Sequence, residues 1–300
     1  MKHLLIAFFL LVFFNSSAQN IVLATYQYAD NNRLENIRPL AKLLSDSLGL
    51  QVQVKSYPSV HEFVEGVQKN EVDVALINTF GYLMLEIARV KNDMKPMLVL
   101  KVKDGTENNY KTAILARNDF PLDTVTQLKR VASDYNLGLV NIGSTSGNLI
   151  PRLKLAAIGI KTPEKKFKTV GYGENHKKAV DLLLAKQTDI CAVGSTEYFS
   201  LLADADKSAS VKLLWMSTEI PLGPVLFHNR LSDTVKQKMV EHFLKLDRTS
   251  PTTLEAIKSG WSEAKQAEKF IKIDQLYYTD FKNQFGNPKA MENILKQFAN

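Results

Sequence analysis

Cysteine is almost absent from this sequence, since Cys191 is the single cysteine among 300 residues. One thiol cannot form an intrachain disulfide, so the fold has to be held together by its hydrophobic core. A chain of this length can bury such a core in one large or two medium-sized domains. Cys191 lies in the apolar run 188–193, where a small buried side chain is a more ordinary role than that of a nucleophile.

The motifs that mark common enzyme classes are also missing. The sequence has no glycine-rich dinucleotide-binding loop, no P-loop and no HExxH motif. Its five histidines are too dispersed to indicate a metal site: His3, His61, His176, His228 and His242. We therefore expect no metal, no cofactor and no catalytic residues, and an enzyme is the least favoured class of function.

A dense basic segment is absent as well, although the net charge is +7 at pH 7. The lysines are scattered, and no basic run is interleaved with aromatic residues, which argues against nucleic acid as a partner. The positive charge is compatible with an anionic ligand, but net charge acts first on solubility and association.

The N-terminus has the composition of a secretory signal peptide. Lys2 and His3 precede the apolar run 4–14, and the small residues Ser16 and Ala18 follow it. The run is shorter than the roughly 20 apolar residues of a membrane span. We expect cleavage after Ala18, which removes residues 1–18 and leaves an exported, periplasmic protein.

The rest of the chain shows two successive α/β patterns. The first predicts strands at 21–26, 51–55, 72–77 and 97–102, with helices at 34–48, 60–69 and 79–90. The second predicts strands at 111–116, 137–142, 167–170, 189–193 and 211–216, with helices at 125–135, 148–158, 175–185 and 196–202. A breaker at Pro221–Pro224 then precedes a returning strand at 225–227, and 232–300 has a helical, amphipathic pattern.

This order predicts mostly parallel sheets with helices on both faces, arranged in two lobes. We expect a first lobe from 19–110, a second lobe from 111–216 and a return to the first lobe in 217–300. The two crossover segments, near 102–111 and 217–225, are the expected hinges for closure of the lobes.

The stretch Ser144-Thr145-Ser146-Gly147 stands between a predicted strand and a predicted helix. The first turn of a helix has unpaired N–H groups and a partial positive charge, so three hydroxyls beside it can form an anion site. Gly147 would let the backbone approach a ligand closely. An ordinary Ser/Thr helix cap explains the same residues, and the turn alone leaves both interpretations open.

Four segments give the chain a family resemblance: NEVDVALINTFGYL (70–83), STSGNLIP (144–151), ENHKKAVDLLLAKQTDICAVGSTEY (174–198) and IPLGPVLF (220–227). With these in order, the chain resembles the phosphate/phosphite/phosphonate-binding proteins of ABC importers over essentially its whole mature length. The resemblance implies a two-lobe, type II periplasmic binding fold that closes on a phosphorus oxyanion. It also implies an ABC permease of the inner membrane as partner, and we expect a monomer.

The resemblance assigns roles to single residues. Ser144, Thr145 and Ser146 would bind the oxyanion with hydroxyls and helix-start N–H groups. Tyr110 would donate to the same oxygens, and His176 would lie beside them, neutral or protonated. Thr79 and Tyr82 would line the opposite wall of the cleft, and Glu197 matches an acid that meets the ligand's ammonium in aminoalkylphosphonate binders.

Two positions depart from the family pattern. Gly223 stands where relatives have the partner acid of the ammonium site, and Val60 stands where some relatives have another tyrosine. This favours phosphate, phosphite or a simple alkylphosphonate over 2-aminoethylphosphonate, and Gly223→Asp should then restore binding of the amine. The alternative function is a ligand-sensing subunit that reports to a membrane receptor kinase.

Overall fold

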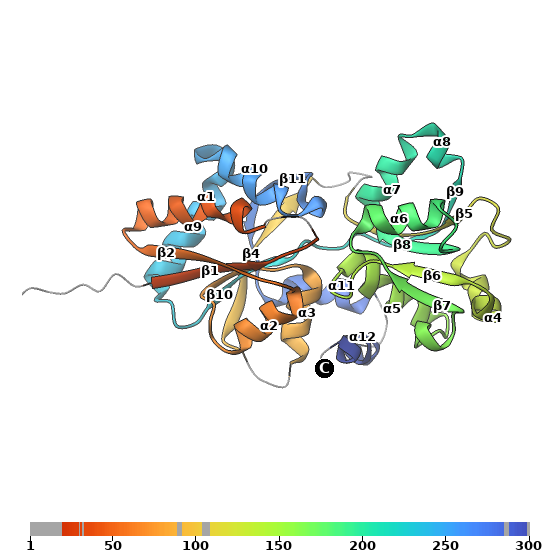
Figure 1. Cartoon of the computed structure of the whole chain (residues 1–300). Helices are drawn as coiled ribbons and strands as arrows, with labels where there is room; N and C mark the ends of the chain where they lie inside the picture. Colours follow the sequence, from red (N-terminus) through yellow and green to blue (C-terminus); the bar gives the residue numbers. More distant parts are fainter. Residues whose placement is uncertain are drawn as a thin grey trace, which may run out of the picture.

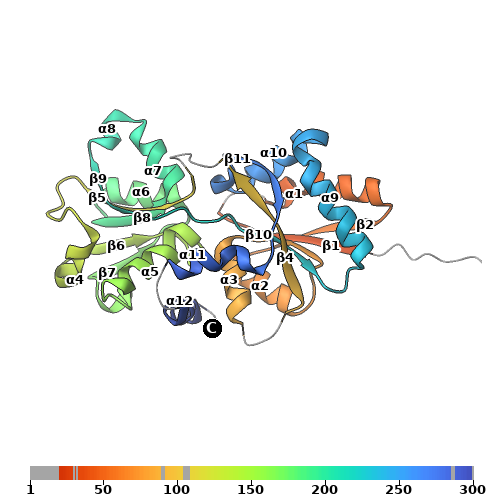
Figure 2. The same ribbon diagram turned by 180° about the vertical axis from the view of Figure 1, so that it is seen from behind.

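The computed structural model describes residues 20–29, 31, 33–88, 92–103, 109–284 and 288–298. The predicted signal peptide therefore lies outside the described residues. Two β-sheets, each with its own helices, lie side by side and are joined by two connections (Figures 1 and 2). In the described part of the chain, no helix is long and apolar enough to span a membrane.

The first lobe is built on a six-stranded sheet with the order β11-β4-β10-β3-β1-β2. Its strands are β1 (Asn20–Tyr26), β2 (Gln51–Tyr57), β3 (Val74–Leu76), β4 (Met94–Val102), β10 (Pro224–His228) and β11 (Ala267–Lys272). Its helices include α1 (Arg33–Leu48), α2 (Val60–Gln68), α3 (Thr79–Ile87), α9 (Asp233–Thr249) and α10 (Pro251–Ser259). These ranges agree closely with the strands and helices predicted up to residue 102, because their apolar periodicity is strong.

The second lobe is built on a five-stranded sheet with the order β7-β6-β8-β5-β9. Its strands are β5 (Thr112–Arg117), β6 (Asn136–Leu139), β7 (Thr169–Tyr172), β8 (Ile190–Gly194) and β9 (Val211–Met216). Its helices are α4 (Leu128–Val131), α5 (Ile150–Ala157), α6 (His176–Leu184), α7 (Ser195–Leu202) and α8 (Ala205–Ser208). The predicted helix 125–135 is in fact broken into α4 and two flanking 3₁₀ turns, 125–127 and 132–134.

The prediction of mostly parallel sheets is wrong. Among the described strands, only the pairs β1–β2, β1–β3, β6–β7 and β6–β8 are parallel. The strands that enter or leave a lobe, β4, β5, β9 and β10, pair antiparallel, as β11 does. The chain crosses between the lobes twice, and the crossing strands run against the local βαβ order.

The prediction of an entirely helical segment after residue 232 is also wrong, because β11 forms the edge of the first sheet against β4. A register shift between Ala267 and Lys269 interrupts the alternation of this strand. As a result, Ala267 and Phe270 are both buried at a spacing of three residues, which resembles one face of a helix.

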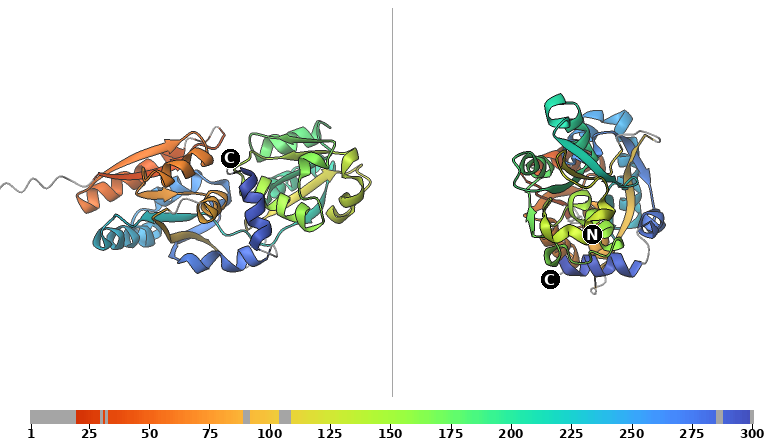
Figure 3. Two further views of the ribbon diagram at one scale, coloured as in Figure 1. Left: turned by 90° about the horizontal axis from the view of Figure 1, so that it is seen from below. Right: turned by 90° about the vertical axis from the view of Figure 1, so that its right-hand side faces the viewer.

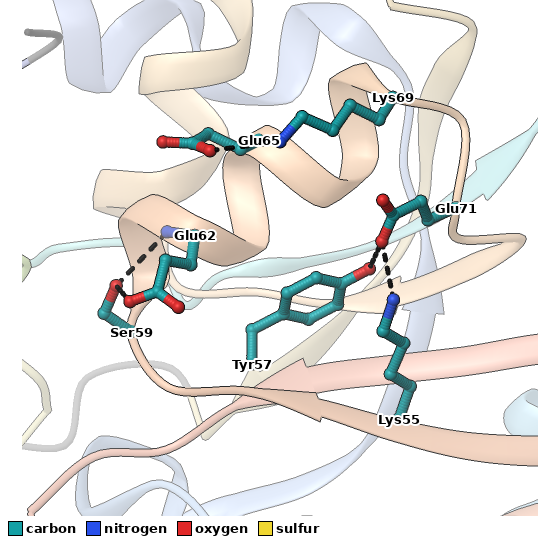
Figure 4. A network of polar contacts seen from close by, with 7 residues as sticks. All are labelled: Lys55, Tyr57, Ser59, Glu62, Glu65, Lys69 and Glu71. Atoms are coloured by element: carbon teal, nitrogen blue, oxygen red, sulfur yellow. Dashed lines mark hydrogen bonds and ion pairs between the residues drawn. The ribbon is translucent and has the colours of Figure 1, made fainter.

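A salt-bridged corner holds α2 against β2 (Figure 4). The Ser59 hydroxyl caps α2 by accepting from the Glu62 N–H at 3.2 Å. At the other end of the helix, Glu71 accepts from the Tyr57 hydroxyl at 2.8 Å and from Lys55 at 2.5 Å. This placement of α2 brings its first residue, Val60, to the boundary between the lobes.

One apolar core extends across that boundary. Leu149, Ile150 and Leu153 of the second lobe belong to the same buried cluster as the core of the first lobe. The cluster also includes Met291, Ile294 and Leu295 of the C-terminal helix α12 (Pro288–Leu295). Figures 1 and 3 show this helix, drawn in dark blue, beside the junction of the two lobes. The lobes are therefore in direct apolar contact.

Candidate functional site

The hydroxyl turn follows β6 and begins a π-helical turn, Thr145–Leu149, that continues into α5. Ser144 is its N-cap, and the Ser144 hydroxyl accepts from the Gly147 N–H at 3.0 Å. A Cβ at Gly147 would lie 2.3 Å from the Val140 side chain, so this glycine is required by packing. The close approach expected of Gly147 is thus toward Val140, within its own lobe.

The turn meets the N-terminus of α3 across the lobe boundary. The Thr145 hydroxyl accepts from the Phe80 N–H at 3.0 Å, and the Asn78 side-chain amide donates to the Gly143 carbonyl at 2.9 Å. Asn78 also caps α3 by accepting from the Gly81 N–H at 2.9 Å. The start of α3 is therefore fixed both to its own helix and to the turn.

The two residues predicted for the opposite wall, Thr79 and Tyr82, have other partners. The Thr79 hydroxyl donates to the Pro221 carbonyl at 2.6 Å, which ties α3 to a crossover segment. The Tyr82 hydroxyl donates to Glu86 at 2.8 Å, and its ring packs against Tyr278. The contacts to the turn come instead from Asn78 and Phe80, their neighbours in sequence.

Tyr110 lies in the first crossover and reaches the turn. Its hydroxyl oxygen accepts from the Ser146 N–H at 3.3 Å, while the Thr112 hydroxyl donates to the Ser146 carbonyl at 2.8 Å. Burial raises the pKa of Tyr110 well above its usual value, so the phenol keeps its proton. The Ser146 hydroxyl is fully buried and has no hydrogen-bond partner within the described part of the chain. The hydroxyls of Tyr110 and Ser146 can therefore each donate a hydrogen bond to a ligand oxygen.

His176 is the first residue of α6 and lies near the Ser146 hydroxyl, beside Gly194. Its Nδ1 accepts from the Gly194 N–H at 3.0 Å, so the proton of the neutral ring is on Nε2. Burial lowers the pKa of His176 to about 4, which keeps the ring neutral at physiological pH. A Cβ at Gly194 would lie 3.1 Å from the Ser146 hydroxyl and 3.7 Å from Nε2 of His176. Gly194 therefore lies against both groups, and a side chain there would press on the Ser146 hydroxyl.

Glu197 makes no hydrogen bond to the turn among the described residues. It lies on α7, where burial raises its pKa, and the charged groups that act on it are Lys177, Asp181 and Lys207. These residues belong to α6 and α8, within the second lobe. The carboxylate whose charge raises the pKa values of Tyr28 and Tyr110 is that of Glu263, which lies near the second crossover.

Sequence reasoning missed Tyr28, which follows β1. Its ring centroid lies 6.4 Å from that of His176, and its hydroxyl is buried with no hydrogen-bond partner among the residues described. Burial and the Glu263 carboxylate raise the pKa of Tyr28, while Arg33 and the nearby Ser144 hydroxyl oppose that shift. Two tyrosines at the end of the first strand, Tyr26 and Tyr28, were the available signal, but the sequence from residue 27 resembles an ordinary polar loop.

Arg33 was missed as well, because it stands at the start of α1 where a solvated charge is usual. Its side chain is buried, and its Cζ lies 4.5 Å, 5.0 Å and 4.7 Å from the ring centroids of Tyr26, Tyr28 and Trp261. Its Nε donates to the Gly260 carbonyl at 2.6 Å. Trp261 is distant in sequence, so the aromatic cage around Arg33 cannot be inferred from local pattern.

Both positions that depart from the family pattern, Gly223 and Val60, are closely packed by their neighbours. A Cβ at Gly223 would lie 1.9 Å from the Ile77 carbonyl oxygen, so no side chain fits there without moving the backbone. The expected gain from Gly223→Asp is therefore excluded on steric grounds. A Cβ at Gly143 would lie 2.2 Å from Val60, so this valine packs directly against the residue before the turn.

The resulting site consists of hydrogen-bond donors from both lobes. They are the hydroxyls of Ser144, Thr145, Ser146, Tyr110 and Tyr28, together with Nε2 of His176. Within the described ranges, no group of three or more His, Cys, Asp or Glu side chains could hold a metal ion. An arrangement of neutral donors around the start of a helical turn is suited to an anion.

Comparison with known proteins identifies a family and a fold. A family model described as "ABC transporter, phosphonate, periplasmic substrate-binding protein" matches residues 23–278. The phosphonates-binding periplasmic protein of Escherichia coli (strain K12) is 24% identical over 226 residues, which cover 75% of this chain and 65% of that protein. The match thus spans less than two thirds of that relative's length.

Two solved structures share the fold. A binding protein component of an ABC phosphonate transporter from Pseudomonas aeruginosa is 20% identical, with a TM-score of 0.66 and coverage of 94% of this chain and 96% of that one. PhnD1 from Prochlorococcus marinus (MIT 9301), solved in complex with methylphosphonate, is 16% identical, with a TM-score of 0.65 and coverage of 91% and 98%. These similarities confirm the predicted two-lobe α/β fold.

Proposed function

The chain belongs to the family of periplasmic substrate-binding proteins of phosphonate ABC transporters, and from this premise we propose that it captures a phosphorus oxyanion between its two lobes. The ligand is phosphate, phosphite or a phosphonate, held without covalent chemistry and released unchanged, so the chain is not an enzyme. The observation that carries the proposal is the buried Ser146 hydroxyl, which lies beside Gly194 together with Nε2 of His176.

The energetics support an oxyanion in this place. Removing a phosphorus oxyanion from water is costly unless each oxygen keeps its hydrogen bonds. Each charge-assisted bond to a neutral donor contributes on the order of 1.5–3 kcal/mol. Ser146, Tyr110 and His176 each offer one donor for which the described part of the chain shows no acceptor within 3.5 Å. Several such bonds together can offset the loss of hydration.

Closure of the lobes is part of the same proposal. We divide the chain at residues 110 and 216, so that the hinges lie in the two crossovers. The bonds of Thr145 to Phe80 and of Asn78 to Gly143 cross the boundary and would break on opening. A ligand that contacts both lobes favours the closed state by population shift. An ABC permease of the inner membrane would then receive the ligand from this state.

The remaining expectations complete the proposal. The protein would act in the periplasm as a monomer after removal of residues 1–18, with no nucleic acid as partner. The description of the family supports the location, and the basic start of the sequence followed by an apolar run supports the export signal.

Isothermal titration calorimetry on the purified mature protein tests the function directly. Four ligands are compared: phosphate, phosphite, methylphosphonate and 2-aminoethylphosphonate. We expect saturable binding of at least one of the first three and weaker binding of 2-aminoethylphosphonate, because Gly223 leaves no room for the second acid. Absence of binding to all four would refute the proposal.

A further inference from the structure

Arg33 is a buried cation that the donors described above do not explain. Its side chain is 3% exposed, and one of its five N–H donors is used by the Gly260 carbonyl. Its Nη1 is buried and has no hydrogen-bond partner in the part of the chain that the structure describes. A guanidinium withdrawn from water is costly unless its donors and its charge are matched. The site of Arg33 is therefore incomplete.

The acid that faces this region does not complete it. The Glu263 carboxylate acts on Tyr26, Tyr28 and Tyr110, but forms no ion pair with Arg33 within 4.0 Å among the described residues. Glu263 instead lines a cavity of about 470 Å³ together with Tyr110 and Thr196. Because Thr196 belongs to α7 of the second lobe, this cavity opens between the two lobes.

The cage connects Arg33 to the hydroxyl turn. The guanidinium lies over the ring of Tyr28, and the same ring approaches His176 at 6.4 Å between centroids. The hydroxyls of Tyr26 and Tyr28 are buried and, like Nη1 of Arg33, make no hydrogen bond within 3.5 Å among the described residues. Longer polar contacts, from Arg33 and Trp261 to Tyr26 and from Ser144 to Tyr28, only oppose the rise in the pKa of each phenol. The Ser146 hydroxyl of the second lobe is also buried and makes no hydrogen bond within the described residues. Four buried donors with no acceptor at hydrogen-bond distance in the described chain, from two lobes, are what a single multivalent oxyanion would satisfy.

We propose that Arg33 determines which ionisation state of the ligand the protein prefers. Its guanidinium, with the Tyr26 and Tyr28 hydroxyls, binds the phosphorus oxyanion from the first lobe. This inference rests on the proposed function and adds a full positive charge to donors that are otherwise neutral, in a region where the Glu263 carboxylate also acts on the tyrosines. The site then selects doubly ionised, amine-free phosphonates over singly ionised ones. An aminoalkylphosphonate is disfavoured, because its ammonium would lie near a guanidinium and has no acid at position 223.

A purely structural role for Arg33 is the competing explanation. Arg33 and Asn31 both donate to the Gly260 carbonyl, so the pair also fastens the loop after β1 to the end of α10. A fastening role predicts a loss of stability on substitution but no change in preference among ligands. The test therefore has to measure ligand preference and stability separately.

The experiment compares the wild type with Arg33→Gln, Arg33→Lys and the control Arg38→Gln. Arg38 lies on the same helix but is exposed and pairs with Glu35. Methylphosphonate and 2-aminoethylphosphonate are titrated by calorimetry at about pH 8 and about pH 5.5, on either side of a second phosphate pKa of about 6. His176 does not titrate in this range, since its pKa is about 4, and burial raises the pKa values of Tyr26, Tyr28 and Tyr110.

We expect the wild type to bind methylphosphonate about tenfold more tightly at the higher pH, and Arg33→Gln to lose about 100-fold at that pH and most of the pH dependence. Arg33→Lys keeps the charge but not the planar fork, and should keep the preference with about tenfold lower affinity. Arg38→Gln should match the wild type.

The outcomes separate the two proposals. If the wild type binds but Arg33→Gln keeps its affinity within a factor of two, with only its melting temperature lowered, Arg33 is a fastening residue and the inference is wrong while the proposed function stands. If the wild type binds none of the phosphorus ligands, the proposed function itself fails. Should Arg33→Gln not fold, Arg33→Lys decides: wild-type affinity at both pH values overturns the inference.

Discussion

The two halves of the site differ in how they are encoded. The half in the second lobe is built around one continuous segment, Ser144 to Gly147, which the sequence alone indicates, with His176 of α6 beside it. The half in the first lobe consists of Tyr26, Tyr28 and Arg33, which the fold brings against Trp261 and Glu263 near the other end of the chain. A contiguous anion-binding turn is visible in sequence, whereas a cage assembled from distant segments is not.

The halves also differ in chemistry. The second lobe offers neutral donors that the backbone partly uses already, as with the Ser144 and Thr145 hydroxyls. The first lobe offers a permanent charge held by aromatic rings. The neutral half can recognise the shape of an oxyanion and the charged half its ionisation state. Variants of one half should therefore change affinity for all oxyanions, and variants of the other should change the preference among them.

The largest effect should come from Ser144→Ala combined with Thr145→Ala. Both hydroxyls are buried, and each can still donate its proton while it accepts from a backbone N–H. Loss of two charge-assisted bonds should weaken binding of every phosphorus oxyanion by about 100-fold or more in calorimetry. The control is Ser133→Ala with Thr169→Ala, two exposed hydroxyls of the same lobe.

A change of less than about twofold in the double variant would mean that the turn is a helix cap and nothing more. Stability must be measured beside affinity, because the Ser144 cap alone should contribute about 1 kcal/mol to the free energy of unfolding.

Most of the fold was predictable because it depends on periodicity. The strands and helices up to residue 102 and the two crossings follow from apolar spacing and breakers. The strand β11 was not predictable, since its bulge gives it the spacing of a helix. Strand direction was not predictable either, because it depends on how the chain returns to the first lobe.

The site was predictable only where neighbours in sequence are neighbours in space. The bond from the Tyr110 hydroxyl to the turn, and the position of His176 beside Ser146, are compatible with the roles that family resemblance implied. The role that resemblance gave to Glu197 stays a prediction: the charges that act on its pKa come from α6 and α8, and burial raises that pKa. Likewise the sequence indicates that Gly223 is not an acid, but only the backbone contact with Ile77 shows that it cannot become one.

A smaller effect concerns the pH dependence of stability that comes from His176, whose ring is kept neutral. The folded protein holds the pKa of His176 near 4, below its ordinary value of 6.5, so the unfolded chain binds more protons between these values. The stabilising contribution is present above about pH 6.5 and is lost as the pH falls toward 4. Chemical denaturation should give a free energy of unfolding lower by about 1–2 kcal/mol at pH 5.5 than at pH 7.5 from this residue.

His176→Gln should remove that part of the pH dependence. Some slope should remain in the variant, because burial also lowers the pKa values of His61 and His228. An unchanged slope in His176→Gln would show that the ring is solvated and does not face an enclosed site.

The smallest expected effect is that of removing a single tyrosine hydroxyl, which should change either the affinity for the ligand or the free energy of unfolding, but not both. The Tyr28 hydroxyl is buried and has no partner in the described chain, so Tyr28→Phe should leave the free energy of unfolding unchanged or raise it. Loss of one donor to the ligand should weaken binding by about tenfold, since a bond to a charged group contributes about 1.5 kcal/mol at the lower end of its range. Tyr82→Phe is the matched control with the opposite pattern, because its hydroxyl donates to Glu86 at 2.8 Å. That variant should lose about 1 kcal/mol of stability and keep its affinity. If Tyr28→Phe binds as the wild type does, the ligand does not reach the first-lobe half, and the site consists of the second-lobe turn and the crossover alone.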